Sequence, residues 1–333
     1  MIYKRILVCA LAWLLAACSE REQSADGAIE LRIGHFPNVT HVQGLVAHHF
    51  SRTGQGWFEQ RVSERVGRPV RVVWYSYNAG PSAMEALFAH SIDLTYVGPS
   101  PVINAYVKAQ GREVRIIAGA VEGGAALVVP QSSTARCAED FRGQVLATPQ
   151  LGNTQDVSCR AWLQSGGLRV TLTGGDATIM PTRNTEQLSL FAKGHFAGVW
   201  TVEPWVSRLE QVGGKVLMDE LTALTTVLAA SEDFLRRSPE LVQAVLAAHS
   251  ELTQWISDHP AEAQQAVAEE LRERTQSSID PALIRKAWPR IRMTARLNEE
   301  LLRRFVKEAC RAGFLRREPD IAGLISLSPS ESK

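Results

Sequence analysis

The sequence predicts an α/β protein built as two lobes, and three observations support this fold class. The chain has 333 residues, more than one domain core usually contains. Short β-branched segments alternate with amphipathic ones, a pattern typical of a parallel sheet covered by helices. After Phe234 the pattern changes to helices alone, which Pro260, Pro281 and Pro289 separate through Cys310.

The composition and net charge of the chain limit the kinds of binding partner that can be inferred from sequence. Hydrophobic residues make up 45% of the chain and charged residues 21%, as in an ordinary globular protein. The formal net charge is +1, so charge gives no reason to expect binding to nucleic acid or to an anionic membrane surface.

Residues 1–18 have the organisation of an export signal. Lys4 and Arg5 precede an apolar run over 6–17 that is too short for a comfortable membrane span. An uncleaved N-terminal anchor is the alternative, but the ending Leu-Ala-Ala-Cys resembles a bacterial lipoprotein processing site. This resemblance implies that Cys18 is lipidated, that 19–29 is a flexible polar tether, and that the folded part lies on the periplasmic or extracellular side of a membrane.

The cysteines leave two alternatives. Cys9 would be removed with the signal and Cys18 would carry lipid, which leaves Cys137, Cys159 and Cys310. An oxidising compartment would allow a Cys137–Cys159 disulfide, because both residues lie in the same region. Three buried free thiols are the alternative. No Cys/His spacing typical of a zinc site is found.

The first lobe is predicted from strands that end in polar loops. Strands are expected over 31–34, 70–75, 91–98 and 114–118. Helices are expected over 42–49 and 57–66, and two more are expected, one that begins near Pro81 and one that ends at Gln110. Polar loops follow the first three strands. Right-handed crossovers would bring these loops to one edge of the sheet, where open α/β sheets bind ligands.

A second α/β series begins with a strand over 125–129. A strand over 145–147 leads through a loop with Gly152 to a helix over 154–164, followed by a helix over 184–193 and a strand over 196–200. Short strands at 217–218 and 225–229 would return the chain to the first lobe. The loop before Thr154 places N–H groups, hydroxyls and amides at a helix start, a natural seat for an anionic or polar group.

Four motifs in fixed order carry a family resemblance. RIGHFPNVTH, SIDLTYVGPSP, TPQLGNTQD and GVWTVEPWVSRL follow the signal. Together they resemble the extracytoplasmic solute-binding proteins of ABC importers, in the nitrate/sulfonate/taurine group, over about 29–271. The resemblance implies a bilobal periplasmic-binding-protein type II fold with a two-segment hinge near 121–125 and 221–227. Lobe 1 would span 30–122, lobe 2 123–224, and 225–325 would return to lobe 1 with C-terminal helices packed on it, before a disordered tail over 326–333.

The resemblance also implies a function and a site. The protein would be a monomer, not an enzyme, that needs no cofactor or metal and delivers a small oxyanion to a permease with its ATPase. An aliphatic sulfonate or taurine is expected ahead of nitrate. The cleft would be lined by polar and small residues of both lobes: His35, Asn38, Thr40, His41, Asn78, Ser82, Gly98, Pro99, Ser100, Asn153, Thr154, Gln155, Thr201, Glu203 and Trp205.

Several residues allow two interpretations. Four histidines at 35, 41, 48 and 49 invite a metal site, but the adjacent pair faces different sides of a helix and no carboxylate has ligand spacing. Hydrogen bonding to a ligand by His35 or His41 is favoured, with His48 and His49 on the surface. Glu203 would contact an amine of the ligand or complement a helix start. Asp156 would repel an anion unless it points away.

Other functions stay open at this level. The same fold family includes pyrimidine-precursor synthases and a chorismate-processing lyase, but no synthase-type cysteine motif and no ordered nucleophile motif is present here. A thiamine-precursor pyrimidine or another heterocycle, stacked on Trp74, Tyr77 or Trp205, is the alternative ligand. A sensor that uses this fold without import is the third class.

Overall fold

The computed structural model describes residues 27–326. The predicted signal peptide, Cys18, and most of the tether and the tail lie outside the described residues. Ser326, the last of these residues, donates its backbone N–H to the carbonyl oxygen of Ile116 at 2.9 Å. Within the described chain no helix is long and apolar enough to cross a bilayer.

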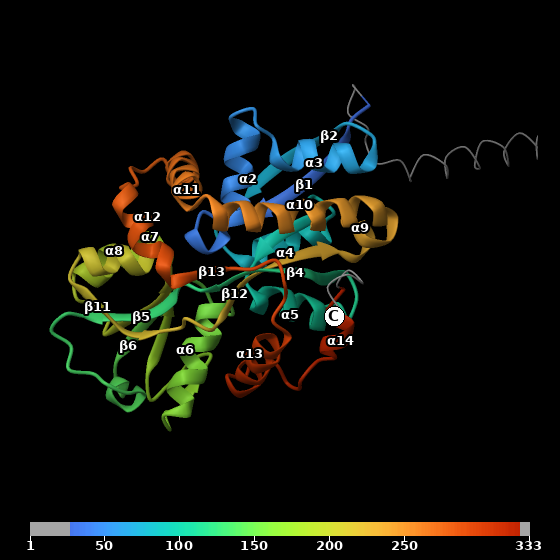
Figure 1. Cartoon of the computed structure of the whole chain (residues 1–333). Coiled ribbons are helices and arrows are strands. Elements are labelled where there is room, and N and C mark those ends of the chain that lie inside the picture. Colours follow the sequence, from blue (N-terminus) through green and yellow to red (C-terminus); the bar gives the residue numbers. More distant parts are fainter. Residues whose placement is uncertain (1–26, 327–333) are drawn as a thin grey trace, which may run out of the picture.

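The first sheet forms the core of lobe 1 (Figure 1). Within the described residues it has six strands in the order β13-β4-β12-β3-β1-β2. Their bounds are β1 Ile29–His35, β2 Val70–Ser76, β3 Leu94–Val97, β4 Val114–Gly123, β12 Leu224–Ser231 and β13 Ile291–Met293. β1 pairs in parallel with both β2 and β3, so the three polar loops that follow these strands share one sheet edge, as the sequence predicted.

The second sheet forms the core of lobe 2. Its order among the described strands is β11-β5-β10-β6-β9, and a two-stranded ribbon, β7-β8, lies beside it in the chain. The bounds are β5 Ala125–Pro130, β6 Val145–Thr148, β7 Val170–Thr171, β8 Gly174–Gly175, β9 Thr178–Pro181, β10 Gly198–Val202 and β11 Gly214–Asp219.

Helices cover both faces of each sheet. One face of the first sheet packs on α2 Val42–Arg52, α3 Trp57–Val66, α10 Pro239–Asp258 and α11 Pro260–Thr275, and the other on α4 Gly80–Phe88, α5 Pro99–Lys108, α13 Glu299–Arg311 and α14 Ile321–Leu324. α6 Thr154–Ser165 covers one face of the second sheet, and α7 Asn184–Ala192 and α8 Trp205–Gln211 the other. The remaining helices are α9 Glu232–Arg237, α12 Pro281–Ala287 and the 3-10 turns η1 Val39–His41, η2 Ala138–Phe141 and η3 Trp288–Arg290.

The chain passes between the two sheets twice. β4 of the first sheet ends at Gly123 and β5 of the second begins at Ala125; β11 ends at Asp219 and β12 begins at Leu224. Gly123 and Gly124 both have φ +76°, a left-handed conformation that favours glycine. A Cβ at Gly123 would also lie 2.4 Å from the carbonyl oxygen of Arg290. The first crossing lies inside the expected hinge segment 121–125, and the second, between Asp219 and Leu224, overlaps the expected segment 221–227 and begins slightly earlier.

The parallel sheet expected for lobe 1 is a mixed sheet. β12 lies between β3 and β4 and is antiparallel to both, so the fourth strand is not a neighbour of the third. A purely parallel sheet was predicted because β12 follows the whole of lobe 2 in the sequence. No local pattern shows between which strands such a returning strand inserts. β3 is also shorter than predicted, because the turn at 91–93 is not part of it.

Of the two cysteine alternatives, the disulfide is wrong and the three buried thiols are correct only in part. Cys137, Cys159 and Cys310 are free, which excludes the Cys137–Cys159 bridge in this structure, and only Cys159 is buried. Cys159 lies inside the lobe 2 core, whereas Cys137 is exposed. Nearness in sequence did not translate into nearness in space.

Candidate functional site

A small cavity of about 40 Å³ lies between the lobes. Lobe 1 lines it with residues that follow β1, β2 and β3 and with Thr225 of β12, and lobe 2 with residues that follow β6 and β9 and with Val202, the last residue of β10. The lining residues are Phe36, Asn38, Thr40, His41, Asn78, Ala79, Gly80, Gly98, Pro101, Pro149, Asn153, Thr154, Gln155, Asn184, Val202 and Thr225. This volume corresponds to roughly three water positions.

Helix N-termini surround this cavity. Among the described residues α4 begins at Gly80, α5 at Pro99 after Gly98, α6 at Thr154 and α7 at Asn184. The first backbone N–H groups of a helix have no partner within the helix, and its N-terminus carries about half a positive charge. None of the described residues that line the cavity is an acid, a lysine or an arginine. The electrostatic environment therefore favours an anion.

Two buried polar atoms at the cavity lack partners. His41 is 3% exposed and Thr154 is 5% exposed, and neither His41 Nδ1 nor Thr154 Oγ1 has a hydrogen-bond partner among the described residues. Burial lowers the pKa of His41 to about 3, so its ring is neutral at pH 7. An unpaired buried polar group costs about 1–3 kcal/mol, which a ligand with oxygen atoms would relieve.

The loop before α6 is organised by a buried ion pair. Asn153 caps the helix, because its Oδ1 accepts from the N–H of Asp156 at 2.9 Å. The Asp156 carboxylate accepts from Thr148 Oγ1 at 3.0 Å, from the N–H of Gly152 at 2.9 Å and from Arg160 Nε at 3.2 Å. The Asp156 carboxylate is thus fully hydrogen-bonded within lobe 2 and does not line the cavity. It therefore points away from the site, and the repulsion of an anion considered from the sequence does not arise.

The structure brings eight of the sequence-predicted residues together at the cavity: Asn38, Thr40, His41, Asn78, Gly98, Asn153, Thr154 and Gln155. Seven others lie outside its lining: His35, Ser82, Pro99, Ser100, Thr201, Glu203 and Trp205. Most of these seven hold lining residues or join the lobes. Thr201 Oγ1 donates to Asn184 Oδ1 at 3.2 Å, Trp205 Nε1 to Asn38 Oδ1 at 3.2 Å, and Ser100 Oγ to the carbonyl oxygen of Gly152 at 2.8 Å.

Glu203 is held by the C-terminal part of the chain. Its carboxylate accepts from the N–H and Oγ of Ser207 at 3.1 and 2.9 Å, and from Arg290 Nη1 at 2.7 Å. Burial raises the pKa of Glu203. Arg290 also contacts Glu210 at 3.2 Å and Asp219 at 3.4 Å. Of the two interpretations of Glu203, these contacts match the carboxylate that complements a helix start, because Glu203 precedes α8 and accepts from its Ser207 N–H. They also join the C-terminal segment to lobe 2.

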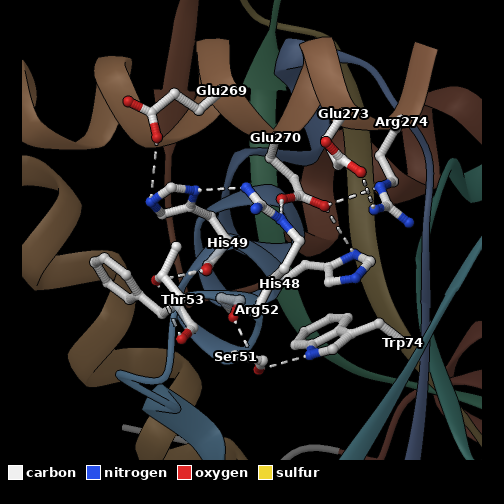
Figure 2. A network of polar contacts seen from close by, with 12 residues as sticks. His48, His49, Ser51, Arg52, Thr53, Trp74, Glu269, Glu270, Glu273 and Arg274 are labelled. Atoms are coloured by element: carbon white, nitrogen blue, oxygen red, sulfur yellow. Dashed lines mark hydrogen bonds and ion pairs between the residues drawn. The ribbon is translucent and has the colours of Figure 1, made fainter. Parts of the chain in front are cut away.

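The remaining predicted histidines belong to a buried network (Figure 2). His35 Nε2 lies 2.8 Å from His48 Nδ1, and His48 in turn lies 3.3 Å from the buried carboxylate of Glu270. His48 and His49 are 8% and 9% exposed, so the expected surface position is wrong. α11 covers them, and which face of α2 it would contact could not be predicted from local sequence. The described chain holds no group of three or more potential metal ligands.

The sequence analysis missed several lining residues, among them Phe36, Asn184, Val202 and Thr225. Asn184 had a signal, since it begins a predicted helix after a strand, as Thr154 does. Thr225 lies on the returning strand, whose position could not be foreseen. Trp74 and Tyr77, expected to stack on a ligand, do not line the cavity either; Trp74 stacks on His48.

The sequence of this chain matches the NMT1-like family over residues 25–271. The chain belongs to the NMT1-like family. A relative named as a putative aliphatic sulfonates-binding protein, from Bacillus subtilis, is 28% identical over 268 residues, which cover 78% of this chain and 75% of the relative.

Solved structures place this NMT1-like protein in the periplasmic-binding-protein fold. The alkanesulfonate-binding protein SsuA from Xanthomonas axonopodis pv. citri, bound to MOPS, superposes with a TM-score of 0.68 at 18% identity and covers 90% of this chain and 98% of its own. The desulfurization enzyme DSZB shares the fold, with a TM-score of 0.63, 15% identity, and coverage of 90% and 97%. The fold therefore occurs in both binding proteins and an enzyme, whereas the relatives from Bacillus subtilis and Escherichia coli are both named as putative aliphatic sulfonates-binding proteins.

Gly98 is expected to determine whether the lobes can close. A Cβ at Gly98 would lie 2.4 Å from Thr154 Oγ1 of the other lobe, yet its φ of −66° suits alanine. Gly98→Ala should therefore fold normally and bind the ligand at least tenfold more weakly, measured by isothermal titration calorimetry with thermal melting as the fold control. Unchanged affinity in a normally folded variant would show that Gly98 and Thr154 do not meet in the bound state.

Proposed function

We propose that this protein is the substrate-binding component of an ABC importer and captures a small oxyanion, an aliphatic sulfonate or taurine ahead of nitrate, between its lobes. The single observation that carries the proposal is the meeting of helix N-termini around a cavity that no described acid lines. Neutral donors and fixed dipoles in a dry site can replace water around an anion.

The cavity dimensions support a small head group. About 40 Å³ accommodates roughly three water positions, comparable with the oxygens of one sulfonate or nitrate group. The sulfonate relatives favour the first of these, because MOPS also carries a sulfonate. A longer substituent on the sulfonate would have to extend out of this cavity through the opening of the cleft.

Capture would couple to closure of the lobes. Cross-cleft contacts exist already: Ser100 Oγ donates to the carbonyl oxygen of Gly152, and the N–H of Val39 donates to the carbonyl oxygen of Glu203 at 3.0 Å. A ligand that touches both lobes stabilises the closed state by its differential affinity for it. The permease with its ATPase would recognise that state, and the lipoprotein-like ending at Cys18 would hold the exported, monomeric protein at the membrane.

A ligand panel tests the oxyanion proposal. Taurine, ethanesulfonate and nitrate, with an aminopyrimidine for the alternative ligand, are each added to the soluble domain that begins after Cys18, and the melting temperature is measured. A ligand at 100 times its Kd stabilises the folded state by about 2.7 kcal/mol. Stabilisation by at least one of the anions supports the proposal, whereas stabilisation by the pyrimidine alone overturns it.

Thr154→Val is expected to weaken anion binding by about 10- to 100-fold, because a hydrogen bond to a charged group is worth about 1.5–3 kcal/mol. Valine keeps the shape of threonine and removes only Oγ1. Ser82→Ala is the matched control, since Ser82 is exposed and lies outside the cavity lining, and its affinity should equal that of the wild type. Equal affinity for both variants would remove Thr154 from the site.

A further inference from the structure

A second cavity, of about 310 Å³, lies between α6 and α13 and is named here the hinge cavity. Ser158 and Trp162 line it from α6, and Arg304 and Glu308 from α13. Trp200 of β10 and Glu220, in the segment that crosses from β11 to β12, also line it. The hinge cavity is therefore formed by lobe 2, by one of the two crossings, and by the C-terminal helices.

Glu220 is a carboxylate without a cationic partner. Its Oε2 accepts from Trp200 Nε1 at 2.8 Å, and its carboxylate also accepts a hydrogen bond from the Ser158 side chain. Within the described chain no lysine, arginine or histidine forms a salt bridge with it. Burial raises the pKa of Glu220 to about 7. A carboxylate that is this poorly solvated gains from a cation that enters beside it.

The other charges of the hinge cavity are partly balanced. Arg304 Nη2 donates to the carbonyl oxygen of Thr222 at 2.9 Å, and Arg304 Nε lies 3.9 Å from Glu308. Arg311 also lines the cavity, and its charge, like that of Arg304, acts on Glu308. The neighbouring α6 group is the Cys159 thiol, whose pKa burial raises, so it stays protonated near neutral pH. Glu220 is left as the group that a bound ligand would satisfy.

We propose that the hinge cavity is a binding site for a small organic ammonium ion, whose –NH₃⁺ group pairs with Glu220 and whose carbon chain packs against Trp162. Aromatic rings attract ammonium groups as well as apolar chains. The volume is ample for a chain of several carbons. This site does not depend on the oxyanion site, although α6 begins at the first cavity and lines the second.

The test uses n-butylammonium with two matched ligands, n-butanol, which lacks the charge, and butyrate, which reverses it. Binding to the soluble domain is measured by saturation-transfer NMR and calorimetry. We expect saturable binding of n-butylammonium at pH 8 and about tenfold weaker binding at pH 6, because a group of pKa about 7 is about 91% ionised at the first pH and about 9% at the second. Butanol and butyrate should bind at least tenfold more weakly.

Glu220→Gln should reduce n-butylammonium binding at pH 8 at least tenfold, because glutamine keeps an acceptor for Trp200 and loses the charge. Glu186→Gln, at an exposed acid of α7, should bind as the wild type does. Binding of butanol as tight as that of n-butylammonium, binding independent of pH, or an unaffected Glu220→Gln variant would each overturn the proposal. If Glu220→Gln does not fold, the pH dependence and the matched ligands in the wild type still decide.

Discussion

Asp156→Ala is expected to lower the free energy of unfolding by about 3–5 kcal/mol, because it leaves a buried charge without its partner. The side chains of Asp156 and Arg160 are 0% and 1% exposed. The substitution also frees the hydroxyl of Thr148 and the N–H of Gly152, which hold the loop before α6. Denaturant unfolding gives the loss of stability, and calorimetry with an anion that the ligand panel finds to bind gives the accompanying loss of affinity.

Removing both charges should cost less than removing one. Asp156→Ala combined with Arg160→Met leaves no unpaired buried ion, so we expect it to recover more than half of the lost stability. Glu299→Ala serves as the control, since it breaks the exposed pair with Arg303, and exposed pairs contribute about 0–1 kcal/mol. A double variant no more stable than Asp156→Ala would contradict this account of the pair.

Acid is expected to destabilise the protein steeply. Burial lowers the pKa of His35 and His249 to about 4 and that of His41 and His48 to about 3. Because an unfolded histidine has a pKa of about 6.5, the unfolded chain binds more protons than the folded chain below that pH. The stabilising contribution is therefore full above pH 6.5 and is lost as the pH falls toward 4.

The magnitude follows from linkage. Four such histidines would remove about 6 kcal/mol between pH 6.5 and pH 5. The raised pKa of Glu220, about 7, acts in the opposite sense by about 2 kcal/mol, because the folded protein then binds the proton first. A net loss of about 4 kcal/mol is expected, a large part of the usual stability of a domain.

Denaturant unfolding at pH 6.5 and at pH 5 measures this loss. His249 is fully buried, between the Tyr96 hydroxyl and the carbonyl oxygen of Gly119. His249→Gln should reduce the pH dependence by about 1.4 kcal/mol per pH unit, whereas His195→Gln, at an exposed position, should not change it. Equal stability at the two pH values would refute the linkage argument.

The sequence was most informative where structure is local. Strand–loop–helix units at 31–49 and 145–164 have strong local signals, namely β-branched runs, glycine or proline at the turn and a capping residue such as Asn153. Parallel pairing of β1, β2 and β3 then follows from right-handed crossovers. The convergence of their loops on one cavity is a consequence of these rules alone.

The rest depends on contacts between distant segments. Whether His35 points into the cleft or behind it is decided by α2, whose Gly44 approaches the His35 side chain so closely that a Cβ would lie 2.8 Å from it. The partner of Glu203 is Arg290, 87 residues further along the chain. Side-chain direction and long-range partners leave no periodic trace in a sequence, so both were beyond prediction.

The position of β12 determines the order in which the two lobes can fold. Residues 125–219 contain the whole second sheet, so lobe 2 is complete as soon as that stretch of chain is available. The first sheet must wait for β12, because β3 and β4 have no shared neighbour until Leu224–Ser231 enters between them. Until then both strands expose unpaired edges, which are templates for association with other chains. We therefore expect lobe 1 to be the more aggregation-prone half until β12 is available. In a chain truncated before residue 224, lobe 1 should need a chaperone to stay in solution, whereas lobe 2 should not.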